Sequence, residues 1–175
     1  CRPEPARGQQ ATLRLRGFTV RGALDLRDVD LSCVVEFDDC AFTDPLALDG
    51  LTTPALRLTG CRVPGVNADR LHVTRGLTVT QSTVDGSIYL RDARIGAQLD
   101  LTGSTVTPTG YTGVRPDIKS ATVTPPEYVG IDAENIVVQG DFGGADLTWH
   151  GALSLNLARI DGALIMTGAH CPEGF

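Results

Sequence analysis

The feature that most constrains this chain is an internal repeat with a period of about eleven. Residues 22–31 and 86–95 both read Gly-x-Leu-x-Leu-x-x-Ala-x-Ile, with the apolar classes loosely kept, and the pattern returns at residues 33–42, 55–63 and 151–160. The first apolar residues of the units are ten or eleven positions apart, except at one double step and one longer gap: Leu24, Val35, Leu46, Leu56, Leu77, Ile88, Leu99, Leu153 and Leu164. A unit this short cannot bury a core alone and has to stack on copies of itself.

A second comparison supports the repeat. Residues 66–105 align without a gap on residues 131–170, so that Gly86, for example, meets Gly151. The offset between these two segments is 65 positions throughout, and one sixth of it matches the unit step of ten or eleven. The repeat therefore extends over most of the chain.

Each unit contains two short apolar pairs whose members are two positions apart, which is the periodicity of a β-strand. Glycine, aspartate, asparagine or Thr-Gly lies between the pairs, and these residue types suit sharp backbone corners. Two units make a four-sided coil of about 21–22 residues, and coils stacked at the strand spacing of about 4.8 Å form a parallel β-helix. An α-helix is excluded, because the pattern would place apolar residues on every face. We therefore predict an all-β chain folded as a right-handed parallel β-helix.

The predicted core consists of the apolar pairs of each unit: Leu24, Leu26, Val29 and Leu31; Val35, Phe37, Cys40 and Phe42; Leu56, Leu58, Cys61 and Val63; and Ile88, Leu90, Ala93 and Ile95. Cys40 and Cys61 occupy the same place in the unit and should be stacked neighbours. We interpret them as buried thiols in a column of small residues that elsewhere holds Ala93 and Ala158, with a redox pair as the alternative. Stacked positions on parallel strands have poor geometry for a disulfide.

The repeat also divides the chain. Residues 12–106 and 131–170 carry the coils, residues 1–11 form a polar N-terminal tail, and residues 171–175 form a C-terminal tail. Residues 107–130 lack the unit pattern and contain four of the ten prolines. We interpret this segment as a loop that leaves the solenoid at one corner, or as a degenerate coil.

Composition excludes several classes of protein. With 42% hydrophobic and 21% charged residues and no apolar run near the ~18 residues of a membrane span, the chain is neither disordered nor membrane-spanning. A net charge of −6 argues against a general phosphate-binding surface, so we expect no direct nucleic-acid binding. No cofactor or metal motif is present, and we predict no cofactor and no metal. No signal-peptide pattern opens the chain, and we expect a cytoplasmic protein.

The sequence resembles a known family of repeat proteins. Residues 11–26 (ATLRLRGFTVRGALDL), 93–103 (ARIGAQLDLTG) and 131–136 (IDAENI) are similar to actinobacterial pentapeptide-related β-helix proteins. The resemblance covers most of residues 11–170 and implies the same β-helical fold. Members are often labelled membrane-associated oxidoreductases, a label for which these residues carry neither a redox-cofactor signature nor an apolar span.

Charge is concentrated near the start of the repeat. Residues 25–49 contain eight acidic residues against Arg27 alone, whereas residues 1–24 contain five arginines and one glutamate. We predict an acidic collar beside a basic tail, which is either a solvated surface or a docking patch for a basic partner. The candidate interaction residues of the acidic collar are Asp25, Asp28, Asp30, Glu36, Asp38 and Asp39.

A second group of candidate residues lies in the irregular segment 107–130. Its clustered functional groups are those of Tyr111, Arg115, Asp117, Lys119 and Tyr128. Loops on a regular scaffold commonly carry binding specificity. Trp149 aligns with Val84, so we interpret it as a core or capping aromatic, with a ligand platform as the alternative.

These observations favour a non-enzymatic β-helical scaffold or protein-interaction module, because the coils are regular and no convergent site is visible. One alternative is an acidic DNA mimic that inhibits a topoisomerase-like protein, although residues 50–125 are net basic. A second alternative is an enzyme with its site at the 107–130 loop. Open strand edges pair readily with other chains, so we predict a protein partner or self-association through the C-terminal coil, whose apolar residues are Leu153, Leu155, Leu164 and Met166.

Overall fold

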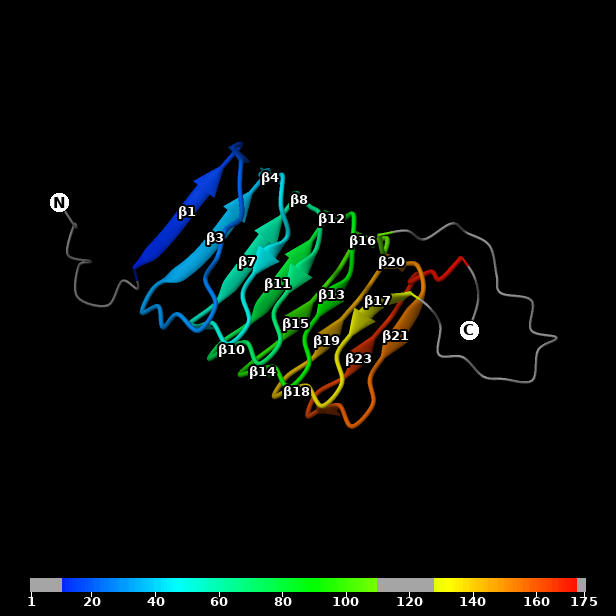
Figure 1. The fold of residues 1–175 in the computed structure, drawn as a ribbon. Helices are drawn as coiled ribbons and strands as arrows, with labels where there is room; N and C mark the ends of the chain where they lie inside the picture. The colour runs from blue at the N-terminus through cyan, green and yellow to red at the C-terminus, as the bar shows by residue number, and fades with distance from the viewer. Residues whose placement is uncertain (1–10, 110–127, 173–175) are drawn as a thin grey trace.

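A computed structural model describes residues 11–109 and 128–172 of the chain. The regular structure in these residues is entirely β-strand, and the strands form four parallel sheets that make the four sides of a solenoid (Figure 1). The chain passes through the sheets in a fixed order, and we name them A to D in that order. The sequence-based prediction of a four-sided parallel β-helix is confirmed.

Each sheet collects one short strand from successive coils. Sheet A contains β1 (Thr12–Arg16), β3 (Val34–Asp38), β7 (Leu56–Thr59), β11 (Leu77–Thr80), β15 (Leu99–Asp100), β19 (Phe142–Gly143) and β23 (Leu164–Ile165). Sheet B contains β2 (Thr19–Val20), β4 (Ala41–Phe42), β8 (Arg62–Val63), β12 (Thr83–Val84), β16 (Thr105–Val106) and β20 (Thr148–Trp149). Sheet C contains β5 (Leu46–Ala47), β9 (Val66–Asn67), β13 (Ile88–Tyr89), β17 (Val129–Asp132) and β21 (Ala152–Ser154). Sheet D contains β6 (Thr52–Thr53), β10 (His72–Val73), β14 (Arg94–Ile95), β18 (Val137–Val138) and β22 (Arg159–Ile160).

The strand register gives the length of a coil. Val35 on β3 pairs with Leu56 on β7, which is a step of 21 positions, and Leu77 on β11 pairs with Leu99 on β15, which is a step of 22. Both steps agree with the predicted coil. Because each strand is short, a single coil is not stable alone, and hydrogen bonds to the strands of the adjacent coils along the solenoid axis stabilise it.

One step is much longer than a coil. β13 pairs directly with β17, so that Ile88 lies opposite Ile131, and β16 pairs directly with β20. The offset of 65 positions found in the sequence therefore contains only two coil steps, from Val66 to Ile88 and from Ile88 to Ile131. The second step contains an insertion of nearly one coil length between β16 and β17. The total offset is therefore the same as the length of three regular coils.

The core fills the solenoid from the second coil onward. Inward residues of sheet A such as Val35, Phe37, Leu56 and Leu58 are at most 2% exposed. The inward residues of the first described coil, Leu24, Leu26, Val29 and Leu31, are only partly buried against this core. They have a described neighbouring coil on one side only, and the same holds for the last described coil.

Two corners of each coil contain a residue in the left-handed backbone region, with φ between 51° and 70°. The column between sheets A and B consists of Gly17, Asp39, Gly60, Gln81, Gly103, Asp146 and Gly168, and the column between sheets C and D of Asp28, Gly50, Arg70, Asp92, Asn135 and Leu157. Glycine, asparagine and aspartate tolerate this region best, which explains why these types recur between the apolar pairs. Leucine is a poor residue for it, and Leu157 is also 81% exposed.

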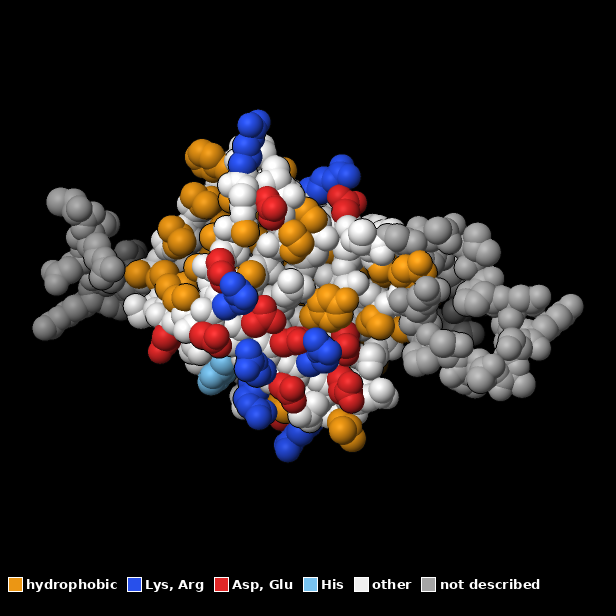
Figure 2. All heavy atoms as spheres, in the orientation of Figure 1, with side chains coloured by type: hydrophobic (Ala, Val, Ile, Leu, Met, Phe, Trp, Pro, Cys, Tyr) orange, Lys and Arg blue, Asp and Glu red, His pale blue; other side chains and the backbone are white. Residues whose placement is uncertain are grey.

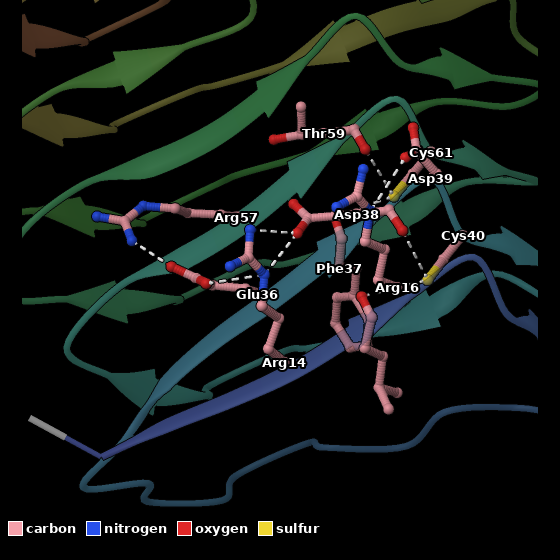
Figure 3. Close-up of polar contacts among 11 residues, drawn as sticks. Arg14, Arg16, Glu36, Phe37, Asp38, Asp39, Cys40, Arg57, Thr59 and Cys61 are labelled. Carbon is pink, nitrogen blue, oxygen red and sulfur yellow. Dashed lines mark hydrogen bonds and ion pairs between the residues drawn. The ribbon is translucent and has the colours of Figure 1, made fainter.

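Cys40 and Cys61 lie in one column at the corner between sheets A and B, and both are free, buried thiols. The Sγ atom of Cys61 lies 3.2 Å from the carbonyl oxygen of Phe37 (Figure 3). The column continues as Ser82 and Ser104, whose hydroxyls accept hydrogen bonds from a backbone N–H of the preceding coil. The interpretation as buried thiols is therefore confirmed. The neighbours are serines rather than the predicted alanines, Ala93 and Ala158, which lie in the opposite corner between sheets C and D.

Within residues 11–109 and 128–172 no helix is long and apolar enough to cross a membrane. Trp149, at the end of sheet B, is 2% exposed and stacks on Val106 of β16. Its predicted place in the core is confirmed.

Candidate interaction surfaces

The outer face of sheet A begins with a cluster of charged residues that includes part of the acidic collar (Figure 3). The guanidinium of Arg14 on β1 lies 2.6 Å from a carboxylate oxygen of Asp38 and 3.6 Å from Glu36, both on β3. Arg57 on β7 forms an ion pair with the other side of Glu36. Since outward residues of stacked strands face each other, arginine and acid alternate along the solenoid axis.

The remaining acids of the collar lie on other sides of the solenoid. Asp25, near sheet C, forms an ion pair with Arg27 at 2.6 Å, and the hydrogen bonds from that guanidinium and from the Arg27 backbone lower the pKa of Asp25 to about 2. Asp28 occupies the corner between sheets C and D, and Asp30 bridges to Thr52 of sheet D. Asp39 lies 3.7 Å from Arg16 at the opposite corner.

The acidic collar is thus distributed around the first two coils, and four of its six predicted residues contact an arginine. Ion pairs this exposed contribute little to stability, because water screens them, but they cancel the local charge. The sequence placed the acids correctly in one region and did not reveal that cross-strand arginines face them.

Sheet C and its corner with sheet D carry a second band of alternating charge. Asp69 accepts two hydrogen bonds from the guanidinium of Arg91, at 3.0 and 2.6 Å, and the same guanidinium lies 5.6 Å from the ring centre of Tyr89. A hollow of about 520 Å³ runs along this corner, lined by Arg27, Asp28, Asp49, Asp69, Arg70, Arg91 and Asp92. In Figure 2 this band appears as interleaved acidic and basic side chains across the lower part of the molecule.

The corner between sheets B and C has a different character. A groove of about 390 Å³ is lined by Pro45, Pro64, Gly65, Asn67, Gly86, Ser87, Tyr89, Pro108, Thr109, Tyr128 and Val129. None of these lining residues is charged. Pro108 and Thr109 precede residues 110–127, which lie outside the described ranges, and Tyr128 follows them, so both described ends of the insertion line the groove.

The predicted loop cluster is only partly described. Tyr128 lies beside β17 and lines the groove, whereas Tyr111, Arg115, Asp117 and Lys119 lie outside the described residues. Sequence reasoning did not single out Tyr89 or the corner prolines. The available signal was that Pro45 and Pro64 both fall shortly before the first apolar residue of a sheet C strand.

The last described coil is the third distinctive surface. Leu164 and Ile165 on β23 are 50% and 40% exposed, and β23 is the terminal strand of sheet A. Leu153, Leu155 and Met166 are only partly buried. Together with the exposed Leu157 at the corner between sheets C and D, these residues make the last described coil an apolar end of the solenoid, which we call the apolar edge and which no other described residue covers.

No group of three or more histidine, cysteine, aspartate or glutamate side chains in the described ranges is arranged to hold a metal ion. The chain matches no protein-family model, no curated protein and no solved structure. The similarity to actinobacterial pentapeptide-related proteins therefore remains a prediction from the sequence, and the surfaces themselves carry the functional argument.

Proposed function

We propose that this protein is a non-enzymatic β-helical interaction module, and that its last described coil is a docking surface for a second copy of the chain. The observation that carries this proposal is the apolar edge formed by β23 and Leu157. Single exposed apolar residues are common on protein surfaces, but here several belong to one edge of an otherwise well-packed core.

Backbone chemistry supports the same surface. A terminal strand of a sheet presents unpaired N–H and C=O groups, and natural proteins protect such edges with charge, proline or a covering segment. β23 consists of Leu164 and Ile165, with glycine and alanine directly before it, so the strand carries neither charge nor proline, and within residues 11–109 and 128–172 no segment covers it. An added strand would satisfy the backbone groups and bury the apolar side chains at once.

The alternatives find less support in the described residues. DNA mimicry requires a continuous row of uncompensated acids, whereas Glu36, Asp38 and Asp39 each contact an arginine. An enzyme requires convergent reactive groups, and the two grooves at the corners of sheet C bring together either acidic and basic side chains or uncharged side chains.

Light scattering at several concentrations tests the proposal. The wild-type mass should rise above 18.5 kDa with concentration, because association through an edge follows mass action. Leu157→Asp should reduce this association, since it places a charge on the edge while aspartate tolerates the backbone of that corner. Arg70→Asp, in the same corner column but in the middle of the stack, is the matched control and should associate like wild type.

The reverse pattern would contradict the proposal. A wild-type mass of 18.5 kDa at every concentration would exclude self-association through the C-terminal coil. Equal association of wild type and Leu157→Asp would place the contact elsewhere on the molecule. Circular dichroism of each variant separates loss of association from loss of fold.

A further inference from the structure

The groove at the corner between sheets B and C is distinct from the C-terminal coil and has the features of a ligand site. Two tyrosines, Tyr89 and Tyr128, and three prolines, Pro45, Pro64 and Pro108, contribute its apolar surface. In Figure 2, hydrophobic side chains are scattered over the upper front of the molecule among polar and charged ones, above the band of alternating charges. An uncharged, aromatic-lined groove on a strongly charged surface favours an uncharged apolar ligand segment.

The groove is built on rigid backbone. A Cβ atom at Gly86 would lie 2.0 Å from the carbonyl oxygen of Pro64, so this floor position has to remain without a side chain. The hydroxyl of Ser87 donates a hydrogen bond of 2.6 Å to the carbonyl of Val129, which ties the returning end of the insertion to the preceding coil. Proline rings lose no rotamer freedom when a ligand packs on them, so binding here costs little ordering of the protein.

The direction and repeat of the groove match one peptide conformation. Its lining residues come from four successive coils, from Pro45 to Tyr128, so it spans roughly 14 Å along the solenoid axis at a strand spacing of about 4.8 Å. A polyproline II helix repeats every three residues, or about 9.3 Å, which is close to two coil steps of about 9.6 Å. A segment of about five residues lying along the axis would therefore present equivalent side chains to alternate coils.

The polar groups of the groove also fit such a segment. Asn67 precedes Tyr89 in the outer column of sheet C, where its side-chain amide can donate to a ligand carbonyl. Asp44 directly precedes the lining residue Pro45 in the chain and accepts a hydrogen bond of 2.7 Å from Thr43, and no described arginine forms an ion pair with it. A basic residue at one end of the ligand would therefore find a carboxylate within reach.

We propose that this groove binds a proline-rich peptide segment in the polyproline II conformation, flanked by an arginine. Recognition of such segments by aromatic-lined grooves uses the preformed ligand helix to limit the entropy lost on binding. The site does not depend on self-association, and its occupant is a peptide of a partner protein.

Fluorescence polarisation with the full chain tests the proposal, using a labelled peptide of six prolines followed by arginine. The peptide should bind saturably but weakly, because a groove of this size buries only a small surface. Tyr89→Ala and Asn67→Ala should each weaken binding, the tyrosine variant at least tenfold, whereas Thr78→Ala on the outer face of sheet A should leave it unchanged. Asp44→Asn should weaken binding of this peptide severalfold and leave binding of hexaproline without arginine unchanged.

Three results would overturn the proposal. One is the absence of saturable binding at peptide concentrations up to about 1 mM, where the binding free energy would be weaker than about −4 kcal/mol. Another is equal binding of a control peptide in which alanine and glycine replace the prolines. The third is binding of a neutral glucan hexasaccharide in place of the peptide, which would make the groove a carbohydrate site. Because light scattering reports on the C-terminal coil separately, failure here leaves the proposed self-association standing.

Discussion

Ile88 on β13 and Ile131 on β17 are cross-strand partners in sheet C, although they lie 43 positions apart in the sequence. Paired residues of neighbouring coils without an insertion are only 20 to 22 positions apart. Because β13 pairs directly with β17 and β16 directly with β20, no additional coil lies between them in sheets B and C. The solenoid and the groove at this corner can therefore be tested separately.

Replacement of residues 107–130 by Asp-Gly-Ser, the connection between Val84 and Ile88, should leave the fold intact. Closing a shorter connection costs less chain entropy, by about 0.6 kcal/mol for each halving of length, so we expect a gain of about 1–2 kcal/mol in the free energy of unfolding. Urea denaturation followed by far-ultraviolet circular dichroism measures this. The same variant lacks Tyr128 and should bind the proline peptide more weakly. A deletion that unfolds the protein would show that the insertion is part of the core.

The left-handed corners give a second prediction. Leu157→Gly should raise the free energy of unfolding by about 0.5–1 kcal/mol, since leucine has a steric cost at φ 57° and its side chain is exposed. Gly86→Ala should lower it by more than about 2 kcal/mol, because the new methyl group would collide with backbone. Thermal melts of both variants check the signs. A stabilising Gly86→Ala would contradict the close approach of the two coils.

The buried thiols give a third prediction. Burial raises the pKa of Cys61, so this thiol should resist maleimide at pH 8 while the partly exposed Cys33 and Cys171 react, as read by mass spectrometry of labelled peptides. A raised folded-state pKa means that the thiol supports the fold below its unfolded pKa of about 8.5 and that this support is lost as pH rises through the folded value.

Cys61→Ser provides the control for this pH effect. A serine fits the column of Ser82 and Ser104 and can donate to the carbonyls that Cys61 contacts, so its cost should stay within about 1.5 kcal/mol. The alkaline loss of stability above pH 8.5 should be smaller in this variant. Rapid labelling of Cys61 in the native protein would show that the corner opens readily.

Much of the fold follows from local sequence, whereas the surfaces do not. The spacing of Leu56 and Leu58 indicates a strand, and residues such as Gly60 indicate the corner after it, because periodicity and backbone preference are properties of a few neighbouring residues. The coil length then follows from the repeat. The pairing of Arg14 with Asp38 depends on strand register between residues 24 positions apart, which a single unit does not contain.

The insertion shows the same limit. Its length is close to one coil, so the arithmetic of the repeat could not distinguish an extra coil from a loop, and only the pairing of β13 with β17 did. The sequence did not indicate a role for Tyr89 in the groove for a related reason. It occupies an ordinary outward position of its strand, and its importance arises from the corner residues of other coils that lie beside it.

Hydrogen–deuterium exchange at low and high protein concentration tests the central claim most directly, because it locates the contact that light scattering only detects. We predict that amides of residues 152–170, which include β21, β22 and β23, become more protected as concentration rises. Amides of the middle coils, such as those of β11 and β13, should exchange at a constant rate. Exchange in residues 152–170 that is independent of concentration while the mass increases would contradict docking through the C-terminal coil.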